Sequence, residues 1–282
     1  MPIHEHSKNN PIIKPDKIRR LSMRIALGIS YQGTAYHGWQ TQKGLSTIQS
    51  ILEEAIGKVA GHPITLTCAG RTDKGVHALG QVVHFDTTAV REDRAWVLGS
   101  NSHLPADICV EWIRSVSDTF HARFSALARR YHYIIYNRPL VSALWNKHTT
   151  HCHYSLNEIA MQIAAEHLLG EHDFSSFRAM GCQSKTAIRK IEHLKVIRQQ
   201  HYVIIDIKAN AFLHHMVRNI AGLLMLIGSG KREPIWAQEV LLAQDRRKAA
   251  VTAQPNGLYL SEVFYANAFS VPVPNINLFN FF

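Results

Sequence analysis

Segments with strand and helix patterns alternate along the chain, and this alternation constrains the fold more than any other feature. In the first half, apolar runs typical of strands cover 25–29, 64–68, 81–85 and 108–116. Helices are expected at 46–59 and 91–100. A capping box at Ser46-Thr47-Ile48-Gln49 begins the first helix, and Gly61 stops it. The polar, glycine-containing segment 31–44 is expected to be a long loop.

The second half repeats this mixture of strands and helices. Strands are expected at 130–136, 191–197, 202–209 and 258–264, with the middle two paired around a turn at 199–201. Helices are expected at 213–227 and 234–244. An earlier helix begins at Ser155-Leu156-Asn157-Glu158 and ends at Gly170, with Ile159, Ile163 and Leu168 as its apolar side. The pattern predicts an α+β protein of two similar layered units, with sites between them.

The length of 282 residues favours two domains or one elongated double unit. We expect a flexible basic arm over 1–21, because this segment shows neither alternation nor a helical stripe. An N-terminal α/β domain over 22–118 and a C-terminal α/β domain over 119–268 follow. The residues 269–282 form a tail.

The charge balance points to a polyanionic partner. Lys and Arg total 31 against 21 Asp and Glu, a formal net charge of +10, so nucleic acid is the leading candidate, although an ordinary basic enzyme is also compatible. The four cysteines stand singly, which fits a reducing cytosol and predicts a cytoplasmic protein. The longest apolar stretch, 220–227, is far short of the roughly 20 residues that span a bilayer, so no membrane association is expected.

Eighteen histidines raise the question of a metal site. The candidate groups are His151-Cys152-His153 and the adjacent His214-His215. Neighbouring side chains on a strand or helix point in different directions, so we expect neither group to hold an ion. The sequence therefore predicts no metal.

One loop carries a carboxylate between two cations. In Cys68-Ala69-Gly70-Arg71-Thr72-Asp73-Lys74-Gly75-Val76-His77-Ala78, Asp73 should stay ionised and available as a nucleophile or base. The same Asp-Lys-Gly triplet is also ordinary turn chemistry between hairpin strands. Local spacing leaves both interpretations open.

The whole eleven-residue string resembles the signature of the TruA family, tRNA pseudouridine synthase A, which reads Ala-Gly-Arg-Thr-Asp-x-Gly-Val-His. The resemblance runs from about 23 to 264. Other stretches that resemble the family are 31–40, 80–85, 120–126, 129–131, 173–177, 208–219 and 257–260. It implies a pseudouridine synthase fold of two ferredoxin-like (RRM-like) α/β sandwich units, with antiparallel sheets and a central catalytic cleft.

The resemblance also implies roles for particular residues. Asp73 would be the essential catalytic carboxylate, and Arg71 would displace the target nucleotide from its stack. Tyr131 would stack on the uracil, Leu258 would pack near it, and Arg218 would pair with Asp73. The residues expected to contact tRNA are Arg71, Arg91, Phe120, His121, Ala122, Arg123, Phe124, Gly181, Cys182, Gln183, Ser184 and Lys185. The cations beside Tyr131, Arg129 and Arg130, could meet phosphates.

The activity implied is isomerisation of uridine at positions 38, 39 and 40 of the tRNA anticodon stem-loop. The implied enzyme needs no cofactor and works as a homodimer. Two other functions remain open. One is a non-catalytic RNA-binding protein on the same scaffold, and the other is a small-molecule enzyme, for instance a hydrolase that uses Asp73 with His77 or His84.

Overall fold

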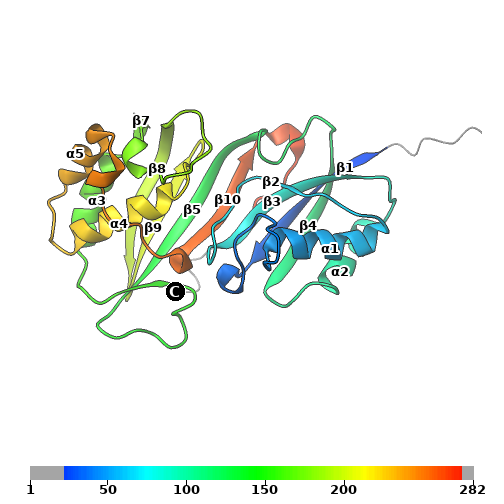
Figure 1. Cartoon of the computed structure of the whole chain (residues 1–282), viewed down its shortest axis with the longest axis horizontal. Coiled ribbons are helices and arrows are strands. Elements are labelled where there is room, and N and C mark those ends of the chain that lie inside the picture. The colour runs from blue at the N-terminus through cyan, green and yellow to red at the C-terminus, as the bar shows by residue number, and fades with distance from the viewer. Residues whose placement is uncertain (1–21, 275–282) are drawn as a thin grey trace, which may run out of the picture.

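A single ten-stranded sheet forms the centre of the molecule. The structure is a computed structural model that describes residues 22–274, so the expected basic arm and the end of the expected tail lie outside the described residues. The main path of the sheet runs β4-β1-β3-β10-β5-β9-β8-β7, with β2 paired to β3 and β6 to β5 (Figure 1). The strands are β1 (Met23–Tyr31), β2 (Thr67–Cys68), β3 (His77–Thr87), β4 (Ile108–Val116), β5 (Ala126–Asn137), β6 (Thr150–Cys152), β7 (Gly170–Asp173), β8 (Ile188–Gln199), β9 (Tyr202–Ala209) and β10 (Leu258–Tyr265).

The two halves of the chain have the same strand order. In the first half the order is β4-β1-β3, with β2 on the far side of β3, and in the second half it is β10-β5-β9-β8. When the short strands β6 and β7 of the second half are left out, each half places its fourth strand beside its first, then its third, then its second. This repetition confirms the expected α+β architecture. The expected domain boundary at 118/119 falls in the connection between β4 and β5 and stays a prediction.

The last strand joins the two halves. β10 is antiparallel to β5, and it is parallel to β3 through Tyr259 opposite His77 and Leu260 opposite Ala78. Because His77 and Ala78 directly follow the Asp73 loop, this pairing brings the C-terminal strand beside that loop. The centre of the sheet is thus built from the beginning, the middle and the end of the chain (Figure 1).

Helices cover the sheet separately in each half. They are α1 (Ile48–Ala60), α2 (Asp93–Asn101), α3 (Glu158–Glu166), α4 (Met216–Gly228) and α5 (Trp236–Ala243). The first two lie together over the first half, and the other three gather over the second half (Figure 1). Among residues 22–274, no helix has the length and apolar character needed to cross a membrane.

The predicted capping box at Ser46 is wrong. Thr47 is the N-cap of α1, and its side chain accepts a hydrogen bond from the backbone N–H of Ser50. The Gln49 side chain instead donates to Glu53 and accepts from the backbone N–H of Thr41. Gln49 therefore ties the preceding loop to the helix rather than closing the cap.

The predicted apolar side of α3 is also largely wrong. Ile159 is 67% exposed and Ile163 is 47% exposed, whereas Met161 is buried. The Asn157 side chain caps the helix and sets its register, and Met161 packs against the bare backbone of Gly228 on α4. Since Gly228 lacks a side chain, Met161 of α3 packs directly against the backbone of α4. The hairpin of β8 and β9 around Gln200, by contrast, is confirmed.

Candidate active site

The loop that carries Asp73 connects β2 to β3, and buried polar groups hold the residues just before Asp73. The side chain of Gln81, fully buried on β3, donates to the carbonyl of Gly70 at 2.6 Å and accepts from its N–H at 3.3 Å. The hydroxyls of Thr72 and Tyr31 lie 2.7 Å apart, and the backbone N–H of Trp39 donates to the carbonyl of Thr72 at 3.0 Å. Buried polar groups are costly unless paired, so this bonding specifies one loop conformation.

The segment 31–40 forms a wall behind this loop. Gly38 has φ +85, and a Cβ placed on it would lie 2.8 Å from the Thr72 carbonyl oxygen. A Cβ on Gly33 would lie 1.9 Å from the carbonyl oxygen of Val76. Both positions therefore require glycine for close backbone approach. The segment 31–40, which the sequence predicted only as part of a long loop, thus packs directly against the backbone of the Asp73 loop.

Asp73 is the centre of a charged cluster whose other members begin α4. Arg218 Nη1 donates to Asp73 Oδ2 at 3.0 Å, and His215 Nε2 lies 3.2 Å from the same oxygen. His214 Nε2 lies 3.6 Å from Oδ1. His215 is the N-cap of α4 and has a left-handed backbone with φ +61. The start of this helix therefore presents three nitrogen-bearing side chains to one carboxylate.

The surroundings of Asp73 keep it negatively charged. Burial raises the pKa of this carboxyl, but the hydrogen bond and charge of His215, together with those of Arg218, outweigh burial and hold the pKa below its ordinary value. Its side chain is 28% exposed, so a ligand can reach it. Asp73 is therefore an ionised and accessible carboxylate, able to act as a nucleophile or a base.

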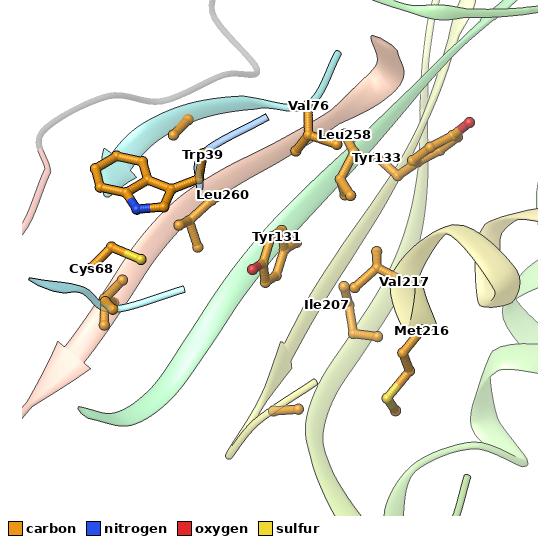
Figure 2. Close-up of a cluster of buried hydrophobic side chains, with 14 of the residues drawn as sticks. Trp39, Cys68, Val76, Tyr131, Tyr133, Ile207, Met216, Val217, Leu258 and Leu260 are labelled. Atoms are coloured by element: carbon orange, nitrogen blue, oxygen red, sulfur yellow. The ribbon is translucent and has the colours of Figure 1, made fainter. Parts of the chain in front are cut away.

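Tyr131 lies on β5 beside the Asp73 loop. It is opposite Leu260 of β10 and Ile207 of β9, and Figure 2 shows it between these two residues in the buried cluster. The ring of Phe212 meets that of Tyr131 edge to face at a centroid distance of 5.0 Å. Burial raises the pKa of the Tyr131 phenol, so its hydroxyl keeps its proton. Leu258, two residues before Leu260 on the same strand, shares the face toward Tyr131.

Most of the predicted site residues line one cleft of about 970 Å³. They are Arg71, Asp73, Arg123, Phe124, Tyr131, Gly181, Cys182, Gln183, Ser184, Arg218 and Leu258. The chain thereby joins segments from four separate regions around Asp73. Arg71 is exposed at the cleft, where its guanidinium is free to meet a ligand.

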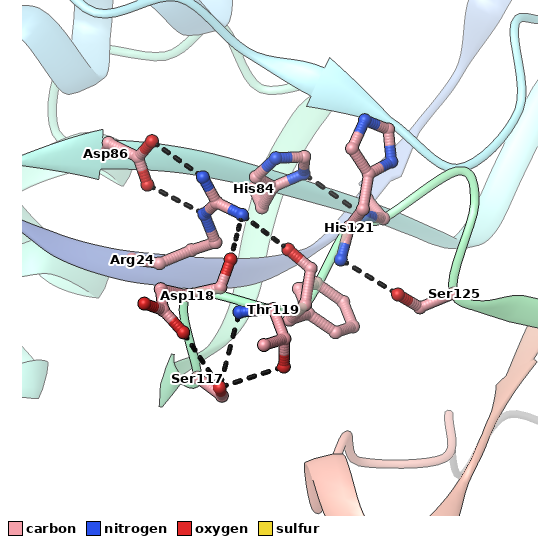
Figure 3. A network of polar contacts seen from close by, with 10 residues as sticks. Arg24, His84, Asp86, Ser117, Asp118, Thr119, His121 and Ser125 are labelled. Atoms are coloured by element: carbon pink, nitrogen blue, oxygen red, sulfur yellow. Dashed lines mark hydrogen bonds and ion pairs between the residues drawn. The ribbon is translucent and has the colours of Figure 1, made fainter.

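Hydrogen bonds with Arg24 and His84 hold the segment 120–124 in place (Figure 3). Arg24 donates to the carbonyl of Phe120 at 2.9 Å, and His84 Nδ1 accepts from the N–H of Ala122 at 3.1 Å. The side chains of Phe120 and Ala122 are fully buried, so they anchor the segment and do not face the cleft. Phe124, in contrast, is 77% exposed.

The other predicted tRNA contacts lie outside the cleft lining. His121 is half-buried beside His84 and Phe124, with ring centroids 4.8 and 4.3 Å away. Arg91 is exposed ahead of α2, where it donates to its neighbour's carbonyl, and Lys185 is exposed beyond Ser184. Their contacts with RNA stay predictions.

Three residues that line the cleft were not predicted to act at the site. They are Phe212, which no residue pattern singled out, and His214 and His215, which were considered only as metal ligands. Arg129 donates to the carbonyls of Ala69, at 3.0 Å, and Arg123, at 2.6 Å, so it braces the loop backbone and is not directed at phosphate. Arg130 forms a bidentate pair with Asp206, at 2.6 and 2.7 Å, and is likewise engaged within the protein.

The side chains of His214 and His215 do not point in different directions, as the sequence had predicted, but lie together. The two imidazole centroids are 3.9 Å apart, because the left-handed backbone at His215 turns the neighbouring side chains toward one another. The wider expectation of no metal stays a prediction. Two histidines that lie three and four residues before Arg218 in the sequence were the signal that could have predicted this cluster.

The histidines of the hydrolase alternative are occupied elsewhere. His77 Nδ1 accepts from the N–H of Gly33 at 3.2 Å, which leaves Nε2 to donate to the carbonyl of Asn256 at 3.1 Å. His84 Nδ1 accepts a hydrogen bond from the N–H of Ala122. Neither residue lines the cleft around Asp73, so neither is placed to act with it.

Comparison with known proteins now bears on this site. A family model described as tRNA pseudouridine synthase matches residues 28–125 and 164–266, which together exceed half of the chain. The chain belongs to the tRNA pseudouridine synthase family. It is thus an enzyme of the class that isomerises uridine to pseudouridine in tRNA.

Individual relatives agree with the family model. Proteins named tRNA pseudouridine synthase A are 56% identical in Coxiella burnetii, covering 88% of this chain and 95% of the relative, and 57% identical in Histophilus somni, covering 89% and 93%. The protein of that name in Colwellia psychrerythraea is 54% identical, covering 89% and 96%. Among solved structures, the archaeal box H/ACA sRNP Nop10-Cbf5 complex aligns with a TM-score of 0.35 at 11% identity, covering 71% of this chain and 44% of that one, which is too weak to bear on the site.

Proposed function

We propose that this synthase isomerises uridine at positions 38, 39 and 40 of the tRNA anticodon stem-loop, with Asp73 as its essential carboxylate. The observation that carries the proposal is the Asp73 carboxylate itself. It is ionised, bound by Arg218 at 3.0 Å, and open to a cleft shared with Tyr131.

The reaction requires little chemical machinery. The bond from ribose C1′ to N1 of uracil breaks, the uracil rotates, and C1′ bonds to C5. C5 loses its proton to solvent and N1 gains one, so no oxidant, reductant or cofactor enters the balance. The enzyme must extrude the base, offer one nucleophile or base, and retain the freed uracil. The single carboxylate of Asp73 can serve any of three routes: addition to C6, attack on C1′, or abstraction of the C2′ proton.

The residues around Asp73 fit the remaining needs. Arg71, exposed at the cleft, would fill the gap left by an extruded nucleotide. Tyr131 would offer an aromatic face to the uracil, and Leu258 would supply an apolar wall of the cleft. The exposed Arg123 and Phe124 on one side and the segment 181–185 on the other would contact the RNA backbone and bases.

Two further features of the proposal concern the enzyme's setting. We propose that it acts as a homodimer, which light scattering at working concentration would show, and a monomer would contradict. We also propose that it works in the cytoplasm, since all four cysteines are free thiols as a reducing compartment requires.

The decisive experiment compares Asp73→Asn with Asp93→Asn. Tritium release from uracil-5-tritiated tRNA should be abolished in Asp73→Asn and unchanged in Asp93→Asn, which alters an exposed aspartate of α2. Both variants should still bind tRNA. Turnover by Asp73→Asn would sink the catalytic assignment, and a wild type that binds tRNA without turnover would favour the non-catalytic RNA-binding alternative.

Mapping pseudouridine in the treated tRNA tests the position. Modification confined to positions 38, 39 and 40 is the expected result, and modification elsewhere would contradict it. Because phosphate contacts release counterions, tRNA affinity should fall steeply with added salt. A flat salt response would instead favour the small-molecule enzyme.

A further inference from the structure

The cluster around Asp73 has a second chemical property besides its charge. The ligand atoms of Asp73, His214 and His215 all lie within 4.8 Å of one another. His214 Nε2 is 3.6 Å from Oδ1, and His215 Nε2 is 3.2 Å from Oδ2. The side chains of His214 and His215 are 42% and 27% exposed, so an ion can enter from the cleft.

These separations match the coordination sphere of a zinc ion. Zinc binds imidazole nitrogen and carboxylate oxygen at about 2.0–2.2 Å, which in a tetrahedron places neighbouring ligand atoms roughly 3.4 Å apart. The distances of 3.2 and 3.6 Å lie on either side of that value. Two imidazoles and one carboxylate form the ligand set of open zinc sites, whereas magnesium and calcium prefer oxygen.

We propose that Asp73, His214 and His215 bind one divalent transition-metal ion, with zinc as the fitting ion. An ion between the two imidazoles meets both carboxylate oxygens of Asp73, Oδ1 beside His214 and Oδ2 beside His215. Oδ2 also accepts from Arg218, whose guanidinium orients the carboxylate but whose positive charge opposes the ion. Binding is therefore reversible, unlike that of a buried structural zinc.

The functional consequence rests on the proposed role of Asp73. An ion bound to this carboxylate occupies the group that must react with uridine, and it sits in the cleft that the extruded base must enter. Zinc is thus an inhibitor that competes with the target nucleotide, not a cofactor. Sequestering two histidines also removes the hydrogen bond by which His215 stabilises the ionised carboxylate.

Metal binding is measured first, without RNA, so that the result does not depend on turnover. Metal-free full-length protein is titrated with zinc chloride by calorimetry, and with cobalt(II) to record the visible absorption of a tetrahedral site. The wild type and His103→Ala, which changes an exposed histidine after α2, should bind equally. His214→Ala and Asp73→Asn should each lose about tenfold or more in affinity for one ion.

Two results would overturn the site. One is equal zinc affinity in all four proteins. The other is a cobalt–thiolate band that disappears in Cys182→Ser, because this would place the ion on the cleft cysteine and not on the Asp73 cluster. Circular dichroism of each variant distinguishes a lost ligand from a lost fold.

Inhibition is measured second. Zinc at saturation should reduce tritium release by the wild type about tenfold or more, magnesium should not, and a chelator should restore the rate. Undiminished turnover with zinc bound at the cluster would overturn the inhibitory role while leaving the proposed function intact. If the metal-free wild type shows no turnover, the proposed function fails, and the binding titration still decides the metal site.

Discussion

Arg218 hydrogen-bonds both to Asp73 and to Ala253, which lies shortly before β10. Its Nη1 donates to Asp73 Oδ2 at 3.0 Å, and its Nε donates to the carbonyl of Ala253 at 2.8 Å. The N–H of Ala253 returns a hydrogen bond to the carbonyl of Arg218 at 3.1 Å. Since the guanidinium is planar, the carbonyl fixes its orientation and therefore fixes the carboxylate.

Arg218→Lys tests this double hold. One ammonium cannot reproduce both bonds in a single plane, so Asp73 loses its orientation and kcat should fall by about 100-fold. The matched control is Arg247→Lys, because Arg247 is 90% exposed and pairs only locally with Asp245. Single-turnover rates on anticodon stem-loop RNA would check the prediction, and equal rates in the two variants would count against it.

Gly38→Ala tests the wall behind the Asp73 loop. The added Cβ would lie 2.8 Å from the Thr72 carbonyl oxygen, so the loop must shift and kcat should fall by about tenfold or more. Gly44→Ala is the control, since Gly44 has a similar φ of +75 but nothing within 4 Å of its Cβ.

Both alanine variants should lose roughly 1 kcal/mol of unfolding free energy from left-handed backbone strain. Only Gly38→Ala should also lose activity. Comparable activity losses in both would show that the strain, and not the contact with the loop, is responsible.

His215→Ala tests the second partner of Asp73. Burial raises the pKa of this carboxyl, and the hydrogen bond and charge of His215 lower it, so removing His215 should raise the pKa of Asp73. Because the ionised form is the proposed reactant, the acid limb of the kcat–pH profile should move to higher pH. Activity well above the limb should be better retained. His103→Ala is the control, and an unmoved acid limb would refute the coupling.

The parts of the fold with local signals were predictable from sequence. Continuous apolar or alternating runs located the long strands, and the polar turn at Gln200 located the hairpin of β8 and β9. The resemblance of the Asp73 string to a known signature supplied what spacing could not, since Asp-Lys-Gly by itself is an ordinary turn. It also named Arg218 and Tyr131, which the fold brings to the same cleft.

The features without local signals were missed. Nothing in the pattern of β10 shows that it pairs with β3, because strand order depends on contacts between distant segments. The close packing of Met161 against Gly228 decides which face of α3 is buried, and the hydrophobic pattern does not. Ile159 is therefore exposed. His215 entered the site through a left-handed backbone that no residue pattern indicates for histidine.

The last prediction concerns the pH dependence of stability, through His77 at the start of β3. The ring of His77 stacks on that of Tyr259 of β10 at a centroid distance of 4.6 Å, and its Nδ1 accepts a hydrogen bond from the N–H of Gly33. His77 therefore links the segment 31–40 to β10, the strand that joins the two halves of the sheet. Burial, with a smaller effect from His148, lowers the pKa of His77 from 6.5 to about 4.

The sign of the effect follows from proton uptake. Below pH 6.5 the unfolded chain binds a proton at this residue, while the folded protein does not until about pH 4, so acid favours unfolding across that interval. His77 alone should lower the unfolding free energy by about 3 kcal/mol between these limits. In His77→Gln, which keeps a donor but cannot titrate, the decline should be shallower by that amount. Urea unfolding at several pH values would measure it, with His103→Gln as the control. Parallel pH profiles for wild type and His77→Gln would contradict the lowered pKa, because they would mean that His77 binds its proton equally well in the folded and unfolded protein.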